Sequence, residues 1–217
     1  MISQTKSIIA FSCFAALVTW FAVLLDLYVT LSNYASSGKS LLSGLVHYLG
    51  FFTVITGIFC ALIFSANALP FKTLPLLNFL QRPTVLTTAE SSIIGVAAVY
   101  HLVLRNLWIP TGLQALSSFL LHYTVPFVYS IFWWCSLPRN ALRWSDLQKI
   151  CLYPIAYGLY IFLRGEALSE YPYPFFDVNT IGYFTASLNA AAIFSSLMAL
   201  SAMLIAVNRN FAHDTSQ

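Results

Sequence analysis

Three polar side chains inside apolar stretches of the sequence have types that could do chemistry together: Thr53, His122 and Asn189. Each lies eight or nine residues past the expected outer start of its stretch. At a rise of 1.5 Å per residue, all three are expected about 12–14 Å below the outer surface, near the middle of a bilayer. Polar side chains are costly at this depth, so each is a candidate for a functional role.

A hydroxyl, an imidazole and a carboxamide at one depth are the groups that acyl transfer requires. His122 can take the proton of the Thr53 hydroxyl, the alkoxide can attack an ester carbonyl, and Asn189 or a backbone N–H can support the oxyanion. The alternative interpretation is structural. Thr53 would then bond to a carbonyl of its own helix, and Asn189 would hold two helices together.

Three further polar residues are expected nearer the outer surface. Asp26 and His101 fall in the outer third of helices that run in the opposite direction, and Arg164 lies at the outer end of its stretch. A guanidinium there can bind a carboxylate through paired hydrogen bonds. The alternative for Arg164 is an interfacial side chain that pairs with Glu166 or Glu170.

The composition determines the class of protein that must position these groups. Of the 217 residues, 59% are hydrophobic and 8% are charged, against roughly 25% charged in an average soluble domain. This excludes a soluble globular enzyme, a disordered chain and a nucleic-acid-binding module. The four cysteines are far apart and form no Cys-x-x-Cys pair, so neither a disulfide framework nor a metal site is predicted, and no cofactor is expected.

Six stretches are long and apolar enough to cross a bilayer, which takes about 20 residues per helix. We therefore predict an all-α, polytopic membrane protein, with residues 1–217 forming one domain that is a bundle of six transmembrane helices. The first stretch is too long for the apolar part of a signal peptide, so it is expected to be retained. Pro126 and Pro154 lie inside stretches and are expected to kink them. The predicted spans are Ser7–Ser32, Gly44–Leu69, Val85–Arg105, Leu113–Ser136, Leu147–Leu163 and Ile181–Val207.

The distribution of basic residues predicts the orientation. Seven of the ten Lys and Arg residues fall on the side of the amino terminus and three on the other side. Because basic loops stay on the cytoplasmic side, both termini are expected in the cytoplasm of a multi-pass protein of the inner (plasma) membrane. Membrane lipids are then its solvent and its expected substrate, and neither nucleic acid nor a protein partner is predicted.

Three segments resemble a known membrane family. They are Tyr48-Leu49-Gly50-Phe51-Phe52-Thr53-Val54-Ile55-Thr56, Leu120-Leu121-His122-Tyr123-Thr124-Val125-Pro126, and a region running from Tyr153-Pro154 through Arg164-Gly165 and Tyr171-Pro172-Tyr173-Pro174-Phe175-Phe176-Asp177 to Asn189. Together they are similar to the bacterial branch of the androgen-induced-gene and androgen-dependent TFPI-regulating-protein family. Its animal members are membrane hydrolases of fatty acid esters of hydroxy fatty acids, with an intramembrane Thr nucleophile and a His partner. The resemblance implies that Thr53 and His122 form this pair.

The leading hypothesis is therefore an intramembrane lipid ester hydrolase. One alternative is a carrier or sensor for a small solute or a proton. It would use a cavity that opens toward the outer face and is surrounded by Asp26, His101, His122 and Arg164. Another is a haem-binding redox protein, because His47, His101 and His122 lie on three different helices. For the hydrolase, the predicted catalytic residues are Thr53 and His122, and the predicted substrate-binding residues are Arg164, Asn189, His101 and Asp26.

Overall fold

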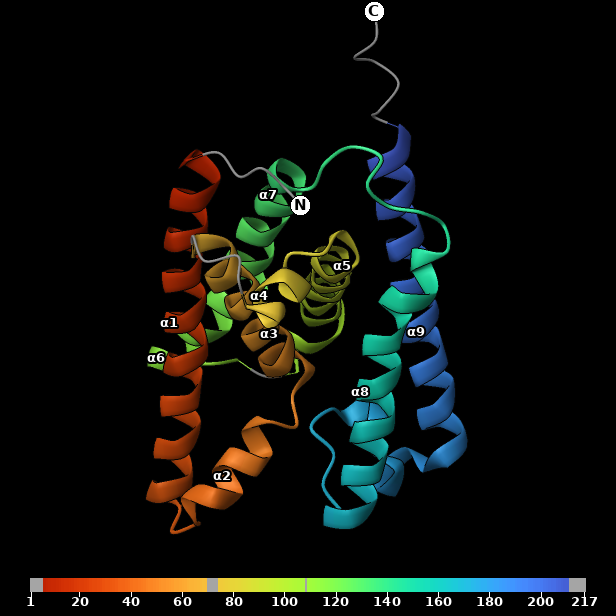
Figure 1. Cartoon of the computed structure of the whole chain (residues 1–217). Coiled ribbons are helices and arrows are strands. Elements are labelled where there is room, and N and C mark those ends of the chain that lie inside the picture. Colours follow the sequence, from red (N-terminus) through yellow and green to blue (C-terminus); the bar gives the residue numbers. More distant parts are fainter. Residues whose placement is uncertain (1–5, 70–73, 108, 211–217) are drawn as a thin grey trace, which may run out of the picture.

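A computed structural model of the chain describes residues 6–69, 74–107 and 109–210, and Figure 1 shows that helices dominate these ranges. No strand occurs in them, so the prediction of an all-α fold is confirmed. The elements are α1 (Lys6–Ser36), α2 (Leu41–Tyr48), α3 (Phe52–Ala68), α4 (Pro75–Leu80), α5 (Pro83–Val99), η1 (Tyr100–Leu104), α6 (Gly112–Phe119), η2 (Leu120–Thr124), α7 (Val125–Ser136), α8 (Asp146–Leu168), η3 (Pro174–Phe176) and α9 (Val178–Asn210).

Four stretches of helix in the described ranges are long and apolar enough to cross a membrane, or five if the bent pair α2 and α3 is taken as one span. The four are α1, α5 with η1, α6 with η2 and α7, and α9. They correspond to the first, third, fourth and sixth predicted spans. The fifth predicted span is helical as α8, with 23 residues, but it is not among the four. By length and composition, the described ranges therefore contain four or five candidate membrane-spanning helices.

The second predicted span is wrong as a continuous helix, because α2 and α3 meet at a bend of 79°. The bend lies at Leu49–Phe51, where the long side chain of Arg164 comes against the backbone. A Cβ atom on Gly50 would lie 3.1 Å from Arg164 Cζ, so glycine allows the close approach that the bend needs. As a result, Thr53 is the second residue of α3 and not a residue in the middle of a long helix.

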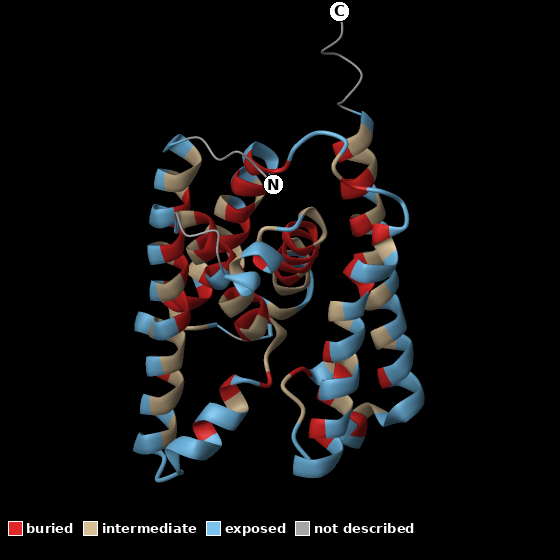
Figure 2. Ribbon diagram, viewed as in Figure 1, coloured by how far each residue is buried: buried red, intermediate tan, exposed pale blue. Residues whose placement is uncertain are grey.

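The main hydrophobic core lies among α1, α3, α5 and α7, where most buried residues gather in Figure 2. α1 and α3 pack closely and bury small residues, among them Ala15, Ala22, Cys60 and Ala61, which are fully buried. α5 contacts α3, α7, α8 and α9. It is seen almost along its axis in Figure 1, whereas α1, α8 and α9 run lengthwise across the view. α8 and α9 pack against each other and against α5, which places them on one side of the core.

Candidate functional site

Thr53 and His122 meet in the structure, although 69 positions separate them in the sequence. The backbone of Phe51 is extended, so α3 begins at Phe52 and the Thr53 side chain leaves from the first helical turn. Thr53 is buried, and its Oγ1 lies 3.4 Å from His122 Nε2. The structure therefore brings together the two residues that were predicted to be catalytic.

The other ring nitrogen of His122 determines which tautomer faces Thr53. Nδ1 lies 2.8 Å from the carbonyl oxygen of Ser118 and 3.3 Å from the Ser118 hydroxyl. Because a carbonyl oxygen only accepts hydrogen bonds, the ring is assigned the tautomer with its proton on Nδ1. Nε2 then presents a lone pair to the Thr53 hydroxyl. A general base needs this arrangement.

The backbone around His122 is π-helical and not α-helical. The N–H of Val125 bonds to the carbonyl of Leu120, five residues back, and Pro126 follows directly. Proline has no N–H to give to the carbonyl four residues before it, which here is that of His122, and its ring would clash there in an α-helix. The wider π turn relieves the clash, and π turns of this kind are frequent at functional sites. The predicted disturbance at Pro126 is thus a local widening of the helix.

The ring of His122 is held from its face by Tyr100, which lies in the other π-helical segment, η1. The two rings are stacked, with centroids 3.8 Å apart and planes inclined by 16°. The Ser118 hydroxyl donates a hydrogen bond of 3.0 Å to the Tyr100 hydroxyl. Ring position and ring tautomer are therefore set by the same serine and its backbone.

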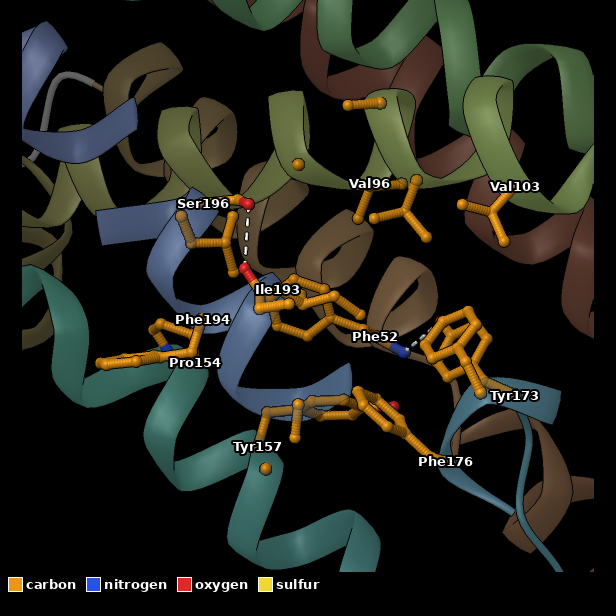
Figure 3. Close-up of a pocket in the computed structure, with 18 of the residues that line it drawn as sticks. Phe52, Val96, Val103, Pro154, Tyr157, Tyr173, Phe176, Ile193, Phe194 and Ser196 are labelled. Carbon is orange, nitrogen blue, oxygen red and sulfur yellow. Dashed lines mark hydrogen bonds between the residues drawn. The ribbon is translucent and has the colours of Figure 1, made fainter. Parts of the chain in front are cut away.

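Tyr173 is a functional candidate that sequence reasoning did not single out. It comes from the connection between α8 and α9, is buried, and accepts a hydrogen bond of 3.0 Å from the N–H of Phe52 (Figure 3). It lines the same cavity as Thr53, the residue that follows Phe52 in the chain. The only signal in the sequence was its position between two prolines in the Tyr-Pro-Tyr-Pro segment, which was noted only as a mark of family resemblance.

Thr53 and Tyr173 open onto a cavity of about 560 Å³ between the start of α3, α5 with η1, and the α8–α9 pair. Figure 3 shows Val96, Pro154 and Ile193 from three of these helices around it. The lining is almost entirely apolar. Its polar side chains are those of Thr53, Tyr157, Tyr173 and Ser196, of which Ser196 bonds to a carbonyl of its own helix and Tyr157 donates to the carbonyl of Gly50 at 2.9 Å. A long hydrocarbon chain matches such a lining.

Arg164 lies away from the Thr53–His122 pair and is engaged within the protein. Its guanidinium donates to the carbonyl of Glu170 at 2.9 Å and to the carbonyl of Val46 at 3.3 Å, and lies 3.7 Å from the Glu170 carboxylate. The Glu170 carboxylate also contacts His47 Nδ1. We call this set, Val46, His47, Arg164 and Glu170, the Arg164 clasp. It joins α2 to the connection that carries Tyr173, as the alternative interpretation of Arg164 expected.

The structure does not bring the other predicted binding residues onto the pair. Asp26 accepts a hydrogen bond of 2.9 Å from Ser117, which neighbours Ser118 in the chain. His101 is exposed, and its Nδ1 lies 3.1 Å from the Tyr123 hydroxyl. Asn189 donates to the carbonyl of Phe175 at 3.0 Å, beside the cavity wall. The common depth predicted for Asn189 therefore corresponds to a contact between α9 and η3, and not to a contact with Thr53.

The histidines considered for haem have separate partners: His47 contacts Glu170, His101 contacts Tyr123, and His122 lies between Ser118 and Thr53. Within residues 6–69, 74–107 and 109–210, no group of three or more His, Cys, Asp or Glu side chains is placed to hold a metal ion. Comparisons with protein-family models, with curated proteins and with solved structures found no match.

Proposed function

We propose that the protein is an intramembrane hydrolase of lipid esters, with Thr53 as nucleophile and His122 as general base. The observation that carries this proposal is the 3.4 Å contact between Thr53 Oγ1 and His122 Nε2, on an imidazole whose other nitrogen is already bonded to a carbonyl. A hydroxyl, a base beside it and a third group that orients the base are the signature of an activated nucleophile. The same hydroxyl borders an apolar cavity.

The reaction proceeds in two halves. Thr53 Oγ1 attacks the ester carbonyl while its proton passes to His122 Nε2, and the tetrahedral intermediate collapses to an acyl-threonine as the proton passes to the leaving alkoxide. Water, deprotonated by the same imidazole, then attacks the acyl-threonine. This step releases the fatty acid and restores the Thr53 hydroxyl. The 3.4 Å separation is long for a hydrogen bond, and contacts of this kind tighten when substrate binds.

The cavity and the resemblance together favour fatty acid esters of hydroxy fatty acids, or similar single-chain lipids, as substrates. An apolar chain would lie along the walls formed by α5, α8 and α9, with its ester at Thr53. The four predicted binding residues remain proposals in this scheme. Arg164 and His101 would be nearest the charged end of the lipid. Asn189 would lie beside the cavity, and Asp26 would lie on the side of the base. Such a substrate would enter sideways from the bilayer.

We also propose that the chain is a multi-pass protein of the inner membrane with both termini in the cytoplasm. Since α5 lies across α1, α8 and α9 (Figure 1), the six predicted stretches do not all cross side by side. The start of α1 and the end of α9 lie at the same end of the molecule in Figure 1, which supports an even number of crossings. The excess of basic residues on that side supports the cytoplasmic assignment.

The proposal is tested by alanine substitution of Thr53 and of His122 in the detergent-solubilised protein, with hydrolysis of a fluorogenic long-chain fatty acid ester as the readout. Each variant is expected to lose activity, by about 10²–10⁴-fold for the base. The matched control is Thr56→Ala, one turn further along α3, which should keep activity. Full activity in Thr53→Ala and His122→Ala would overturn the proposal.

A further inference from the structure

The Tyr173 hydroxyl lies at the amino-terminal end of α3, beside the Thr53 side chain. It accepts the N–H of Phe52 at 3.0 Å, and it lines the same cavity as Thr53 (Figure 3). Only 7% of Tyr173 is exposed, so the hydroxyl is held away from bulk water. A phenol can accept one hydrogen bond and donate another at the same time. Since the Phe52 N–H uses an acceptor site on the oxygen, the phenolic proton is left for a second group.

The end of α3 offers further donors of the same kind. The first N–H groups of a helix have no acceptor within the helix. In α3 the Phe52 N–H goes to Tyr173, and the first backbone bonds inside the helix start from Val54 and Ile55, both to the carbonyl of Phe51. The N–H of Thr53 has no acceptor among the backbone bonds at this end of the helix. The helix dipole adds partial positive charge at this end.

We propose that Tyr173 is a catalytic residue that donates a hydrogen bond to the oxyanion formed when Thr53 attacks an ester. This inference rests on the proposed function. The carbonyl oxygen of a bound ester becomes negatively charged within a bond length or two of Thr53 Oγ1, where the Tyr173 hydroxyl and the Thr53 N–H are the neighbouring donors. Tyr173 keeps its proton throughout, and His122, on the other side of the Thr53 hydroxyl, carries out the proton transfers.

The surroundings of Tyr173 hold its ring without help from the hydroxyl. The ring stacks on Phe175 at 5.1 Å between centroids and meets Phe51 edge-on at 5.7 Å. The Arg164 clasp anchors the same connection through Glu170, three residues earlier. Phenylalanine at position 173 should therefore keep the ring in place and remove only the donor.

The experiment compares Tyr173→Phe with wild type, with Thr53→Ala and with the matched control Tyr153→Phe. Tyr153 lies in α8, and its hydroxyl also reaches α3, where it lies 3.1 Å from Thr56 Oγ1. Two readouts are taken: hydrolysis of a fluorogenic long-chain ester, and inhibition by a long-chain trifluoromethyl ketone beside the matching long-chain alcohol. The ketone forms a tetrahedral adduct with an oxyanion, whereas the alcohol only fills the cavity.

Tyr173→Phe is expected to lower kcat by about 10²–10³-fold, the range for loss of one oxyanion donor. The affinity for the ketone should fall by a similar factor, whereas KM and the affinity for the alcohol should stay nearly unchanged. Tyr153→Phe should resemble wild type in all of these quantities. The inference is overturned if Tyr173→Phe keeps the wild-type kcat and the wild-type affinity for the ketone. It is also overturned if the affinities for the ketone and the alcohol fall equally. In either case the hydroxyl would be only a structural cap of α3. Wild-type activity in Thr53→Ala would instead overturn the proposed function.

Discussion

Two regions of different packing meet at Thr53. On the side of α1, α3, α5 and α7, large side chains such as Phe64, Tyr129 and Phe132 are fully buried in one continuous core. On the side of α8 and α9, a second cluster has four buried residues, Tyr157, Ile161, Tyr173 and Phe176, and leaves a cavity of about 560 Å³. Figure 2 shows the contrast, with little burial along α9.

The difference assigns separate tasks to the two regions. Close packing fixes His122 between Ser118, Tyr100 and Thr53, and a general base must be held in one orientation to act. In the proposed hydrolase, the loosely packed side would provide space for an acyl chain that differs from one lipid to the next. Such an enzyme would keep its reacting groups rigid while the wall that binds the chain stays adaptable.

The largest effect is expected from breaking the connection between the two regions at the Arg164 clasp. Arg164→Met leaves the carbonyls of Val46 and Glu170 without their donor and removes a guanidinium whose side chain is only 5% exposed. We expect a loss of about 2 kcal/mol in the free energy of unfolding, in the range for lost hydrogen bonds from a charged group. Denaturation of the purified protein in detergent measures it.

Glu170→Gln is the milder control, because the Glu170 side chain is 45% exposed and Arg164 would keep its backbone partners. It should cost about 1 kcal/mol. If Arg164 binds the carboxylate of the substrate, Arg164→Met also raises KM for esters that carry a free carboxylate and leaves KM for uncharged esters unchanged. If Arg164→Met were as stable as wild type, the Arg164 clasp would not stabilise the fold.

The cavity is tested by filling it from α8. A Cβ atom on Gly158 would meet nothing within 4 Å, and Gly158 lines the cavity. Gly158→Leu should therefore fold and should lower kcat/KM for long-chain esters about tenfold relative to short-chain esters, since each methylene of fit is worth 10-fold or more. Activity against a series of acyl chain lengths provides the measurement. Gly158→Ala serves as control, and an unchanged chain-length preference in Gly158→Leu contradicts the assignment of the cavity.

The smallest effect is expected at the other end of α8, where Asp146 begins the helix. Burial raises the pKa of the Asp146 carboxyl, but the bonds it accepts from Lys149 Nζ at 2.8 Å and the Arg143 N–H at 2.9 Å outweigh this, so its pKa lies below the ordinary 3.8. A carboxyl with a lowered pKa stabilises the fold at pH values above 3.8, and this contribution disappears as the pH falls through its folded-state pKa.

Asp146→Asn should accordingly cost about 1 kcal/mol at neutral pH. The difference from wild type should vanish in acid, and ester hydrolysis at neutral pH should be unaffected. Unfolding followed from pH 7 to pH 3 checks this. If the difference in free energy of unfolding between Asp146→Asn and wild type persisted unchanged to pH 3, the ionised Asp146 carboxylate would not be the source of that stability.

The helices could be predicted from the sequence because their apolar stretches are long, and the Thr53–His122 contact could be predicted because polar residues at one depth are few. The bend before Thr53 could not. Leu49–Phe51 is as apolar as its surroundings, and Arg164, which packs against Gly50 at the bend, is more than a hundred residues away in the sequence. The depth estimate that paired Thr53 with His122 assumed a continuous helix, so it reached the right contact through a geometry that the structure corrects.

Other predictions failed to converge on the site because depth does not determine direction. Asn189 shares the estimated depth of Thr53, but its side chain bonds to Phe175, and Asp26 turns to Ser117. Tyr173 could not be found by depth at all, since it belongs to a connection that folds back into the molecule. The prolines on either side of it were the available signal for such a constrained segment.

Covalent labelling shows directly whether Thr53 is the nucleophile. The detergent-solubilised protein is treated with a long-chain fluorophosphonate, and the modified peptide is identified by mass spectrometry, for wild type, Thr53→Ala, His122→Ala and the control Thr56→Ala. We expect an adduct on Thr53 in wild type and in Thr56→Ala, and no adduct in Thr53→Ala or His122→Ala. An adduct on another residue, or labelling that survives Thr53→Ala, would contradict it.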